Sequence, residues 1–413
     1  MPFRNLALSS PVLEAIREAG YTEPTPIQSA AIPPILAGRD LIGIAQTGTG
    51  KTAAFAWPIL TKLSAEPQSG SRCAPRALVL APTRELAAQI QENIRAYGKH
   101  LSLRTASVFG GVSEQPQIQA LRSSLDILVA CPGRLIDLHG QGYGDLSAIR
   151  CLVLDEADRM LDMGFLPAIR QIVKKLPRER QTLLFSASLS PEIESLTREF
   201  LRSPKLVEIG RRANPAETVT QFVYEVAPHL KTALLSHLLK DPQFDTVLVF
   251  ARTKHRADRL AHQIERTGIK TATLHSNRSQ SQRMRALRDF KAGAARVLVA
   301  TDIAARGIDV DGISHVINFD LPQNPEDYVH RIGRTGRAHA IGDAISFVTP
   351  EDRGALRSLE RFLGRGIPRK LAEGFDHAAP TPPSQEEAQA NSKRPYRPRS
   401  FARPGRRAAK PSR

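Results

Sequence analysis

Short apolar segments recur between residues 40 and 350, and each is followed by a stretch in which the apolar residues have helical spacing. Two examples are DLIGIAQ at 40–46 and ARVLVATD at 295–302. Segments that are apolar on both faces are typical of parallel strands that helices cover from both sides. We therefore predict a doubly wound α/β fold. The expected strands lie at 40–46, 76–82, 125–131, 151–157 and 181–188, and at 245–253, 270–276, 295–302, 314–320 and 343–350.

The predicted strands form two series with the same alternation of strand and helix. The segment EIGRRANPAET at 208–218 separates the series, and its Gly, Asn and Pro are typical of a linker. After about residue 373 the alternation stops, and the sequence becomes rich in Pro, Ser, Gln and Arg, as in chains that cannot bury a core. The sequence thus predicts an α/β domain at 1–207, a linker at 208–218, a second α/β domain at 219–373 and a disordered basic tail at 374–413.

The chain is strongly basic, with 58 Lys and Arg against 41 acidic residues and a formal net charge of +17. Nine of the basic residues lie in 391–413, where there is no acid. This excess favours a polyanionic partner, either nucleic acid or an anionic membrane surface. Within the tail, Tyr396 and Phe401 stand among arginines, which suits stacking on bases beside phosphate contacts. A solvated tail without a partner would have the same composition.

Composition also excludes several classes of protein. A hydrophobic fraction of 41% is enough for packed cores, and no apolar run reaches the 18 or so residues of a membrane span. The N-terminal segment includes Glu14 and Glu18 and lacks the apolar core of a signal peptide. The three cysteines, Cys73, Cys131 and Cys151, are scattered without the spacing of a metal site, which favours a reducing, cytoplasmic location.

The motif that carries most chemistry is AQTGTGKT, from Ala45 to Thr52, between a predicted strand and a predicted helix. Gly48 and Gly50 allow the backbone to curl so that successive N–H groups point at phosphate oxygens. Lys51 supplies a point charge to the β- and γ-phosphates, and the Thr52 hydroxyl suits Mg²⁺. The usual P-loop pattern begins with Gly where this chain has Ala45, and a Gly-rich turn can be merely structural. The flanking strand and helix favour the phosphate site.

A P-loop needs an acid at the end of a neighbouring strand, and CLVLDEAD at 151–158 provides one. Asp155 would hold Mg²⁺, and Glu156 would orient or deprotonate the attacking water. An isolated acidic cluster could instead be the solvated start of a helix, which the helix dipole favours. Beside a P-loop, the catalytic interpretation is the stronger one.

Asp-Glu-Ala-Asp at 155–158, with the ordered motifs around it, resembles the DEAD-box ATP-dependent RNA helicases of superfamily 2 over about residues 3–350. The resemblance implies two tandem RecA-like domains that close over ATP and single-stranded RNA. The segment 20–28 is similar to the family's Q motif, so Gln28 would contact the adenine edge. Phe3 matches the upstream aromatic residue that stacks on adenine, although a Phe near a terminus is more often a core or partner contact. A compact core followed by a short basic tail looks most like bacterial members of the family, in particular those that resemble RNA helicase E.

The resemblance also implies the remaining nucleotide contacts and the catalytic set. Gly307 and Asp309 would contact the ribose, and Arg334 and Arg337 would act as arginine fingers from the second domain. Ser186-Ala187-Ser188 corresponds to the Ser-Ala-Thr that couples hydrolysis to strand separation, with a methyl group lost at Ser188. The residues assigned to nucleotide binding are Phe3, Gln28, Ala45, Gln46, Thr47, Gly48, Thr49, Gly50, Lys51, Thr52, Gly307 and Asp309. Those assigned to catalysis are Lys51, Asp155, Glu156, Ser186, Ser188, Arg334 and Arg337.

Further motifs resemble the family's contacts to the RNA backbone. They are PTREL at 82–86, GG at 110–111 and PGR at 132–134 in the first domain, and VFART at 249–253, QSQR at 280–283 and Thr301 in the second. Each could otherwise be a turn or a helix cap, and Thr83 is a plausible cap. Cys131 stands where the family commonly has Thr. The residues assigned to RNA binding are Pro82, Thr83, Arg84, Gly111, Gly133, Arg134, Arg252, Gln280, Arg283 and Thr301.

Together these motifs imply an ATP- and Mg²⁺-dependent RNA helicase that unwinds short RNA duplexes locally or remodels ribonucleoproteins. Sequence specificity should be low, because the expected contacts are to the RNA backbone. Two alternatives remain open: a nucleotide-gated RNA clamp or annealing chaperone without productive unwinding, and a DNA translocase of the same superfamily. The family suggests ribosomal or RNA-decay proteins as partners, with no membrane association.

Overall fold

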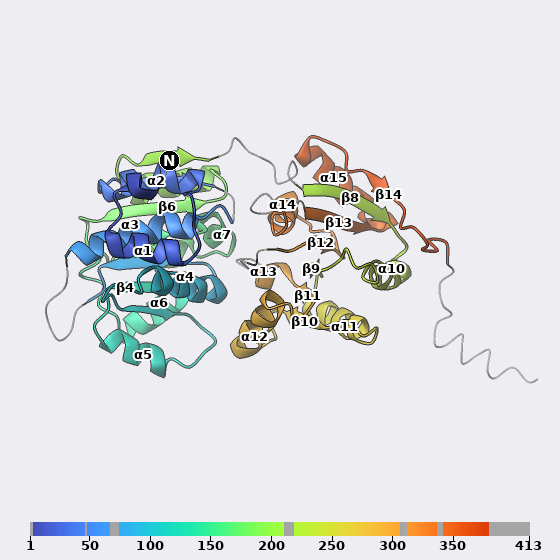
Figure 1. Ribbon diagram of the computed structural model, residues 1–413, viewed down its shortest axis with the longest axis horizontal. Coiled ribbons are helices and arrows are strands. Elements are labelled where there is room, and N and C mark those ends of the chain that lie inside the picture. The colour runs from blue at the N-terminus through green and yellow to red at the C-terminus, as the bar shows by residue number, and fades with distance from the viewer. Residues whose placement is uncertain are drawn as a thin grey trace, which may run out of the picture. The chain divides into compact units, whose positions relative to one another are not determined.

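The computed structural model describes residues 3–45, 48–66, 74–209, 219–305, 310, 312–336 and 342–379. These residues form two seven-stranded sheets, and every strand pairing in both sheets is parallel (Figure 1). The chain up to Phe375 clusters into one compact unit that contains both sheets. The predicted doubly wound α/β fold is therefore confirmed, whereas residues 380–413 of the predicted tail and 210–218 of the predicted linker lie outside the described residues.

The strands of the first sheet lie in the order β3-β4-β2-β5-β6-β1-β7. They are β1 (Leu41–Ile44), β2 (Ala77–Leu80), β3 (Thr105–Val108), β4 (Ile127–Ala130), β5 (Cys151–Leu154), β6 (Gln181–Ser186) and β7 (Lys205–Glu208). The central strands β2 and β4 are buried at every residue, as expected for strands covered on both faces.

The second sheet repeats this topology strand for strand, in the order β10-β11-β9-β12-β13-β8-β14. Its strands are β8 (Val219–Glu225), β9 (Val247–Phe250), β10 (Thr271–Leu274), β11 (Val297–Ala300), β12 (His315–Asn318), β13 (Gly342–Val348) and β14 (Arg369–Lys370). Sequence reasoning found five strands of each sheet and missed β3, β7, β8 and β14. Three of these lie at sheet edges, where half-exposed strands lose the continuous apolar run, and β8 contains the polar residues Thr220, Gln221 and Glu225.

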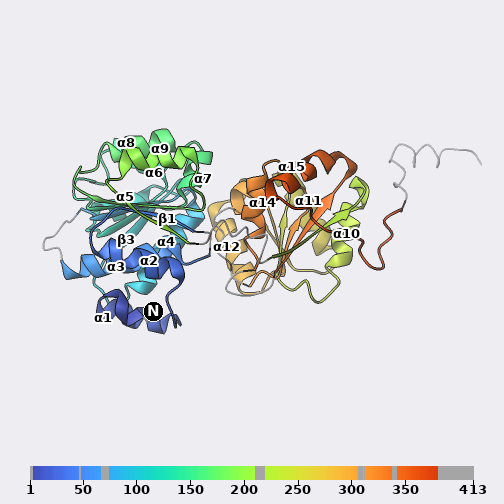
Figure 2. The same cartoon turned by 90° about the horizontal axis from the view of Figure 1, so that it is seen from above.

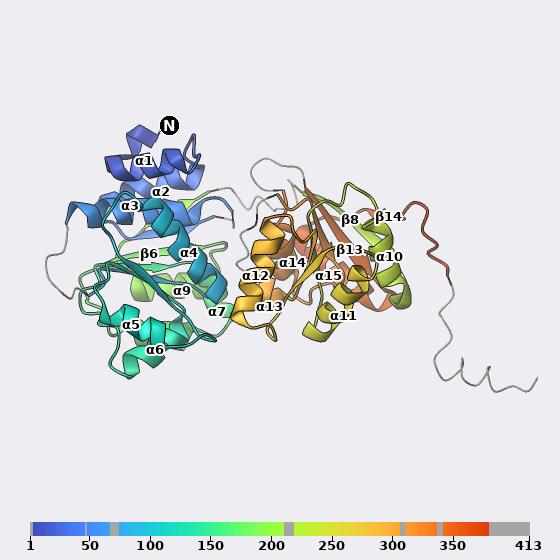
Figure 3. The ribbon, with the colours of Figure 1, turned by 60° about the horizontal axis from the view of Figure 1, so that its bottom comes forward.

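Helices cover both faces of the first sheet, as Figure 2 shows. One core contains residues of α1 to α4 and one face of the sheet, and the other packs α5 to α9 against the opposite face. Figure 3 shows α1 lying over α2 and α3, on the side away from the sheet. The helices are α1 (Ser10–Glu18), α2 (Pro26–Leu36), α3 (Lys51–Ala65), α4 (Arg84–Tyr97), α5 (Gln115–Arg122), α6 (Pro132–Gly140), α7 (Ala157–Asp162), α8 (Leu166–Val173) and α9 (Pro191–Phe200), with a 3₁₀ turn η1 (Phe3–Leu6) before them.

The second sheet has its own hydrophobic clusters. One packs α12 and α13 against β9 to β11, and another packs α14 and α15 against β8 and β13. The elements are η3 (Pro228–Leu230), α10 (Lys231–Leu238), α11 (Lys254–Glu265), α12 (Gln280–Lys291), α13 (Asp302–Ala305), α14 (Pro325–Ile332), η4 (Pro350–Asp352) and α15 (Arg353–Leu363).

The two sheets also use the same local device where a helix follows the second strand of each series. Thr83 caps α4 by accepting a hydrogen bond from the Leu86 N–H at 3.4 Å, and Thr253 caps α11 by accepting one from the Arg256 N–H at 3.2 Å. A threonine at the N-cap satisfies one of the N–H groups that the first helical turn leaves without a partner. Thr83 is thus a helix cap, as the alternative interpretation of this motif suggested, and its contact to RNA stays a prediction.

Candidate active site

The predicted P-loop connects β1 to α3, and Lys51 is the first residue of that helix. Gly50 has a φ of 91°, and a Cβ added there would lie 2.4 Å from Nε2 of Gln28, so only glycine fits. Lys51 is buried, and its Nζ donates a hydrogen bond to the carbonyl of Ala45 at 2.6 Å. Thr52 follows in the first turn of α3. This arrangement holds the lysine ammonium against the loop that is expected to contact phosphate.

The Q-motif glutamine is fully buried and is bonded to the P-loop. Its Oε1 accepts the Thr25 N–H at 2.9 Å, and its Nε2 donates to the Gly50 carbonyl at 3.3 Å. Phe3 meets Trp57 of α3 edge-to-face, with ring centroids 5.5 Å apart. Gln28 and Phe3 are therefore both attached to the helix or loop that presents Lys51, which links the expected adenine and phosphate contacts mechanically.

Asp155 directly follows β5 and is only 2% exposed. Burial raises the pKa of its carboxyl from 3.8 to about 7, although the ammonium of Lys51 acts in the opposite direction. The Asp155 Oδ1 accepts the N–H of Glu156 at 3.1 Å. A carboxyl held this deep beside a lysine can bind a cation only by releasing its proton, which is the behaviour expected of a metal ligand.

Glu156 adopts a left-handed conformation with a φ of 51°, one of the few non-glycine residues to do so. Its Oε2 accepts a hydrogen bond from the Arg159 guanidinium at 2.7 Å. Burial disfavours the ionised carboxylate, but the positive charges of Arg159, Arg334 and Lys51 outweigh it and hold the pKa of Glu156 below its ordinary value. Two adjacent acids thus have opposite pKa shifts, which is typical of sites with separate acid, base and metal roles.

The last acid of the motif, Asp158, ties the motif to the end of β6. Its Oδ2 accepts the N–H of Ala187 at 2.9 Å. Ser186 is fully buried, and its hydroxyl makes no hydrogen bond to the described residues, whereas Ser188 is exposed. The Ser-Ala-Ser segment is therefore positioned by the acidic motif itself.

One pocket is lined both by residues that follow strands of the first sheet and by residues in or just after α14, which packs on the second sheet. Its lining residues are Lys51, Glu156, Asp158, Arg159, Asp162, Ala187, His330 and Arg334. Arg334 is 4% exposed and lies just after α14. Burial lowers the pKa of His330, and the neighbouring Arg334 lowers it further against the pull of Asp158, so the imidazole is neutral near pH 7.

Five of the predicted nucleotide-site residues, namely Gln46, Thr47, Gly307, Asp309 and Arg337, lie outside the described residues. The Arg334 pocket, the P-loop and the acids are therefore the parts of the site that the structure brings together.

The first-domain residues predicted to contact RNA gather beyond the carboxyl ends of β2, β3 and β4. Arg84 lies across Gly111, whose φ is 76° and whose added Cβ would lie 1.7 Å from the Arg84 guanidinium. Arg134 donates to the carbonyl of Val112 at 3.5 Å, and Gly133 is exposed at the start of α6. Pro82 is buried beside the Thr83 cap. Two arginines and open backbone at one edge suit contacts to phosphates.

In the second domain Arg252 and Thr301 follow β9 and β11. The Arg252 N–H donates to Asp320 Oδ2 at 3.0 Å, and its half-exposed guanidinium lies 3.7 Å from Asp352. Gln280 and Arg283 of α12 are placed differently, because both contact the buried carboxylate of Glu85. Gln280 Nε2 donates a hydrogen bond to it at 3.0 Å, and the Arg283 guanidinium forms an ion pair with it at 2.9 Å. Glu85 is a residue that sequence reasoning did not assign. These two side chains bind a protein carboxylate from α4.

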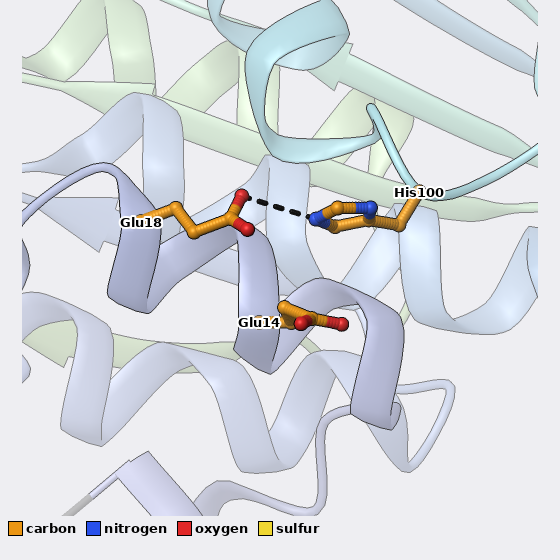
Figure 4. Close-up of side chains that lie close together, drawn as sticks. All are labelled: Glu14, Glu18 and His100. Carbon is orange, nitrogen blue, oxygen red and sulfur yellow. Dashed lines mark hydrogen bonds and ion pairs between the residues drawn. The ribbon is translucent and has the colours of Figure 1, made fainter.

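A separate group of acids and a histidine lies on the surface of the first domain, formed by Glu14, Glu18 and His100 (Figure 4). Glu18 accepts a hydrogen bond from His100 at 3.0 Å and pairs with Lys99. The hydrogen bond from Lys99, which has the larger effect, and that from His100 both lower the pKa of Glu18. A carboxylate already paired with a lysine is poorly suited to a metal ion, and we assign no role to this group.

The P-loop lysine, Glu156 of the acidic motif and Arg334 line one pocket, and the chain has two parallel sheets of the same topology. These features define a nucleotide-hydrolysing protein with tandem RecA-like domains. Two family models match the chain: DEAD/DEAH box helicase over residues 25–196 and the helicase conserved C-terminal domain over residues 230–339. The chain belongs to the DEAD-box family of ATP-dependent RNA helicases.

Similar proteins agree with this assignment. The chain is 43% identical to the DEAD-box ATP-dependent RNA helicase CshA of Geobacillus kaustophilus, over 91% of this chain and 79% of the relative. It is 44% identical to the DEAD-box ATP-dependent RNA helicase 30 of Arabidopsis thaliana, over 90% of this chain and 64% of that longer relative. The finer resemblance to helicase E-type members stays a prediction.

Solved structures show the same architecture. Dbp5 of S. cerevisiae bound to RNA and ADP BeF3 matches with a TM-score of 0.80 at 30% identity, over 89% of this chain and 95% of that one. A DEAD box protein from Methanococcus jannaschii matches with a TM-score of 0.54 at 37% identity, over 90% and 99%. Within the described residues, no helix is long and apolar enough to cross a membrane.

Proposed function

We propose that RNA bound across the two domains completes the ATP site, so that hydrolysis is coupled to local separation of RNA strands or to remodelling of ribonucleoproteins. The observation that carries the proposal is that Lys51, Glu156 and Arg334 line one pocket although they follow strands of different sheets. An arginine finger typically contributes about 10³–10⁵ in rate. Hydrolysis would therefore depend on the two domains being held together, and RNA is the ligand that would hold them.

Each residue near the pocket would have a distinct task. Lys51 and the P-loop N–H groups would bind the phosphates, Glu156 would orient the attacking water and accept its proton, and Arg334 would stabilise charge on the γ-phosphate. Asp155 and Thr52 would hold Mg²⁺, and the burial of Asp155 fits this role because a bound cation compensates a carboxylate that burial disfavours. Mg²⁺, when bound, neutralises charge on the phosphate oxygens.

RNA would lie along the carboxyl ends of strands in both sheets. Arg84, Arg134 and Arg252 would pair with phosphates, and Thr301 would donate its hydroxyl to another. The likeness to a yeast relative whose structure contains RNA supports this assignment. A strand held at several phosphates in a bent path cannot remain in a continuous duplex, so binding would separate the strands locally.

The test is RNA-stimulated ATP hydrolysis by Glu156→Gln. We expect loss of hydrolysis with ATP affinity retained, since the substitution removes the base without changing the size of the side chain. Glu92→Gln, an exposed glutamate on α4, is the matched control and should hydrolyse ATP normally. Wild-type hydrolysis by Glu156→Gln would overturn the assignment. Comparing RNA with DNA, and hydrolysis with duplex unwinding, separates the helicase from a DNA translocase and from an RNA clamp.

We propose further that the basic tail adds RNA affinity without sequence preference. If all nine charges of residues 391–413 contacted single-stranded RNA, the slope of log affinity against log salt would change by roughly 6. A truncation after residue 390 should lose that slope, and an unchanged slope would overturn the proposal. A cytoplasmic location and ribosomal or RNA-decay protein partners remain predictions from the sequence.

A further inference from the structure

The ion pair between Arg159 and Glu156 has an ordinary three-residue spacing but is unusually well buried. The Arg159 guanidinium lies 2.7 Å from Glu156 Oε2, and both side chains are only 9% exposed. A second pair with the same three-residue spacing, Arg17 and Glu14 of α1, is 3.6 Å apart and is 78% and 51% exposed. Exposed pairs of this kind contribute little, whereas a buried charge must be matched closely by its partner. The Arg159 pair is thus built into the protein interior.

The pair lies inside the candidate active site. Arg159 lines the same pocket as Lys51 and Arg334, one turn of α7 beyond Glu156. Glu156 is the N-cap of α7 and has a left-handed backbone with a φ of 51°, so its side chain does not follow the repeating geometry of the helix. Arg159 binds one oxygen, Oε2, and no other side chain among the described residues donates a hydrogen bond to this carboxylate.

We propose that Arg159 is a positioning residue for hydrolysis: it holds Glu156 by Oε2 and so directs Oε1 at the attacking water. This inference rests on the proposed role of Glu156 and deepens it. Arg159 acts through the carboxylate and does not contact the nucleotide. A guanidinium suits this task because it is planar and always charged and loses less conformational freedom for each hydrogen bond than a flexible ammonium does.

The inference predicts a separation of kinetic effects. Arg159→Gln should lower kcat for RNA-stimulated hydrolysis by roughly 10- to 100-fold, since a misplaced catalytic group loses about this much. The KM for ATP and the dissociation constant for a non-hydrolysable ATP analogue should stay within about twofold. Arg159→Lys should recover part of the lost kcat because it keeps the charge. Arg17→Gln removes the exposed pair and should behave as wild type.

A double variant separates the inference from the proposed function. If Arg159 acts only through Glu156, then Glu156→Gln with Arg159→Gln should hydrolyse ATP no more slowly than Glu156→Gln alone. The double variant also removes both buried charges, so it tests the residues even if Arg159→Gln alone folds poorly. A higher kcat for Arg159→Gln would show that the pair restrains Glu156 instead, and a weaker nucleotide affinity would show direct contact. Either result would overturn the inference, whereas an active Glu156→Gln would overturn the proposed function itself.

Discussion

The two sheets have the same topology, yet among the described residues only the first has a glycine-rich loop before its lysine helix. In the first, Lys51 opens the helix after β1 and Asp155 follows β5. In the second, Lys231 opens the helix after η3, which follows the equivalent strand β8, and Asp320 follows the equivalent strand β12. Both sheets therefore place a lysine and an aspartate after the carboxyl ends of equivalent strands, which is the edge where open α/β sheets bind ligands.

The difference lies in what the two charges contact. In the second sheet the Lys231 ammonium lies 3.4 Å from Asp320 and 3.8 Å from Asp352, with lysine and Asp320 almost fully buried. In the first sheet the Lys51 ammonium bonds to the Ala45 carbonyl. The β1–α3 connection contains glycines with positive φ, whereas VAPHL at 226–230 contains none. Topology thus supplies the two charges, and the connecting loop decides whether they serve a ligand or each other.

The largest expected effect comes from replacing the two aspartates by asparagine. Asp320→Asn should destabilise the protein by about 3–5 kcal/mol because it leaves the buried Lys231 largely uncompensated. Asp155→Asn should cost little stability, since burial already disfavours that carboxylate, but should abolish ATP hydrolysis. Urea unfolding and an ATPase assay on both variants measure this. Equal losses of stability would mean that the Asp155 carboxylate is also structural.

The contribution of Asp155 to the free energy of unfolding should depend on pH. The folded pKa of Asp155 is about 7, above its ordinary value of 3.8, so between these values the folded chain retains a proton that the unfolded chain has released. The free energy of unfolding should therefore fall as pH rises from about 4 to 7. Unfolding curves of wild type and Asp155→Asn across this range isolate the contribution, because the variant lacks the group. A difference that is constant with pH would contradict the raised pKa.

Sequence reasoning predicted the elements whose chemistry is local. The residues of AQTGTGKT and DEAD are contiguous in the sequence, so the helix start at Lys51 and the buried acid after β5 could be predicted from these motifs. Contacts between distant segments could not be predicted. Gln280 and Arg283 contact Glu85, which lies almost 200 positions away in the sequence. From the motif alone, these two side chains were predicted to contact RNA phosphates. The sequence shows Arg159 three residues after Glu156, but only the structure shows that this ion pair is buried, unlike an ordinary surface pair.

A smaller effect is expected from glycine substitutions in the two domains. Gly50→Ala should cost roughly 1–3 kcal/mol because alanine is strained at a φ of 91°, and the new methyl would displace Gln28. Gly354→Ala, in the first turn of α15, meets nothing within 4 Å and should be neutral or stabilising by up to about 1 kcal/mol. Thermal unfolding of both variants gives the sign. A stable Gly50→Ala protein that still binds ATP would show that the loop can adjust.

The smallest effect concerns two hydroxyl groups, that of Ser186 at the end of β6 and that of Thr349 directly after β13. Thr349 Oγ1 donates to Asp352 Oδ2 at 2.8 Å in the turn that begins η4, so Thr349→Ala should cost about 0.5–2 kcal/mol. Ser186 is equally buried, but its hydroxyl has no hydrogen bond to the described residues, so Ser186→Ala should leave stability unchanged. If the Ser186 hydroxyl serves coupling, the alanine variant should still hydrolyse ATP with RNA but unwind duplexes more slowly. Loss of stability in Ser186→Ala would instead indicate a structural hydroxyl, and unwinding at the wild-type rate would remove the role in coupling.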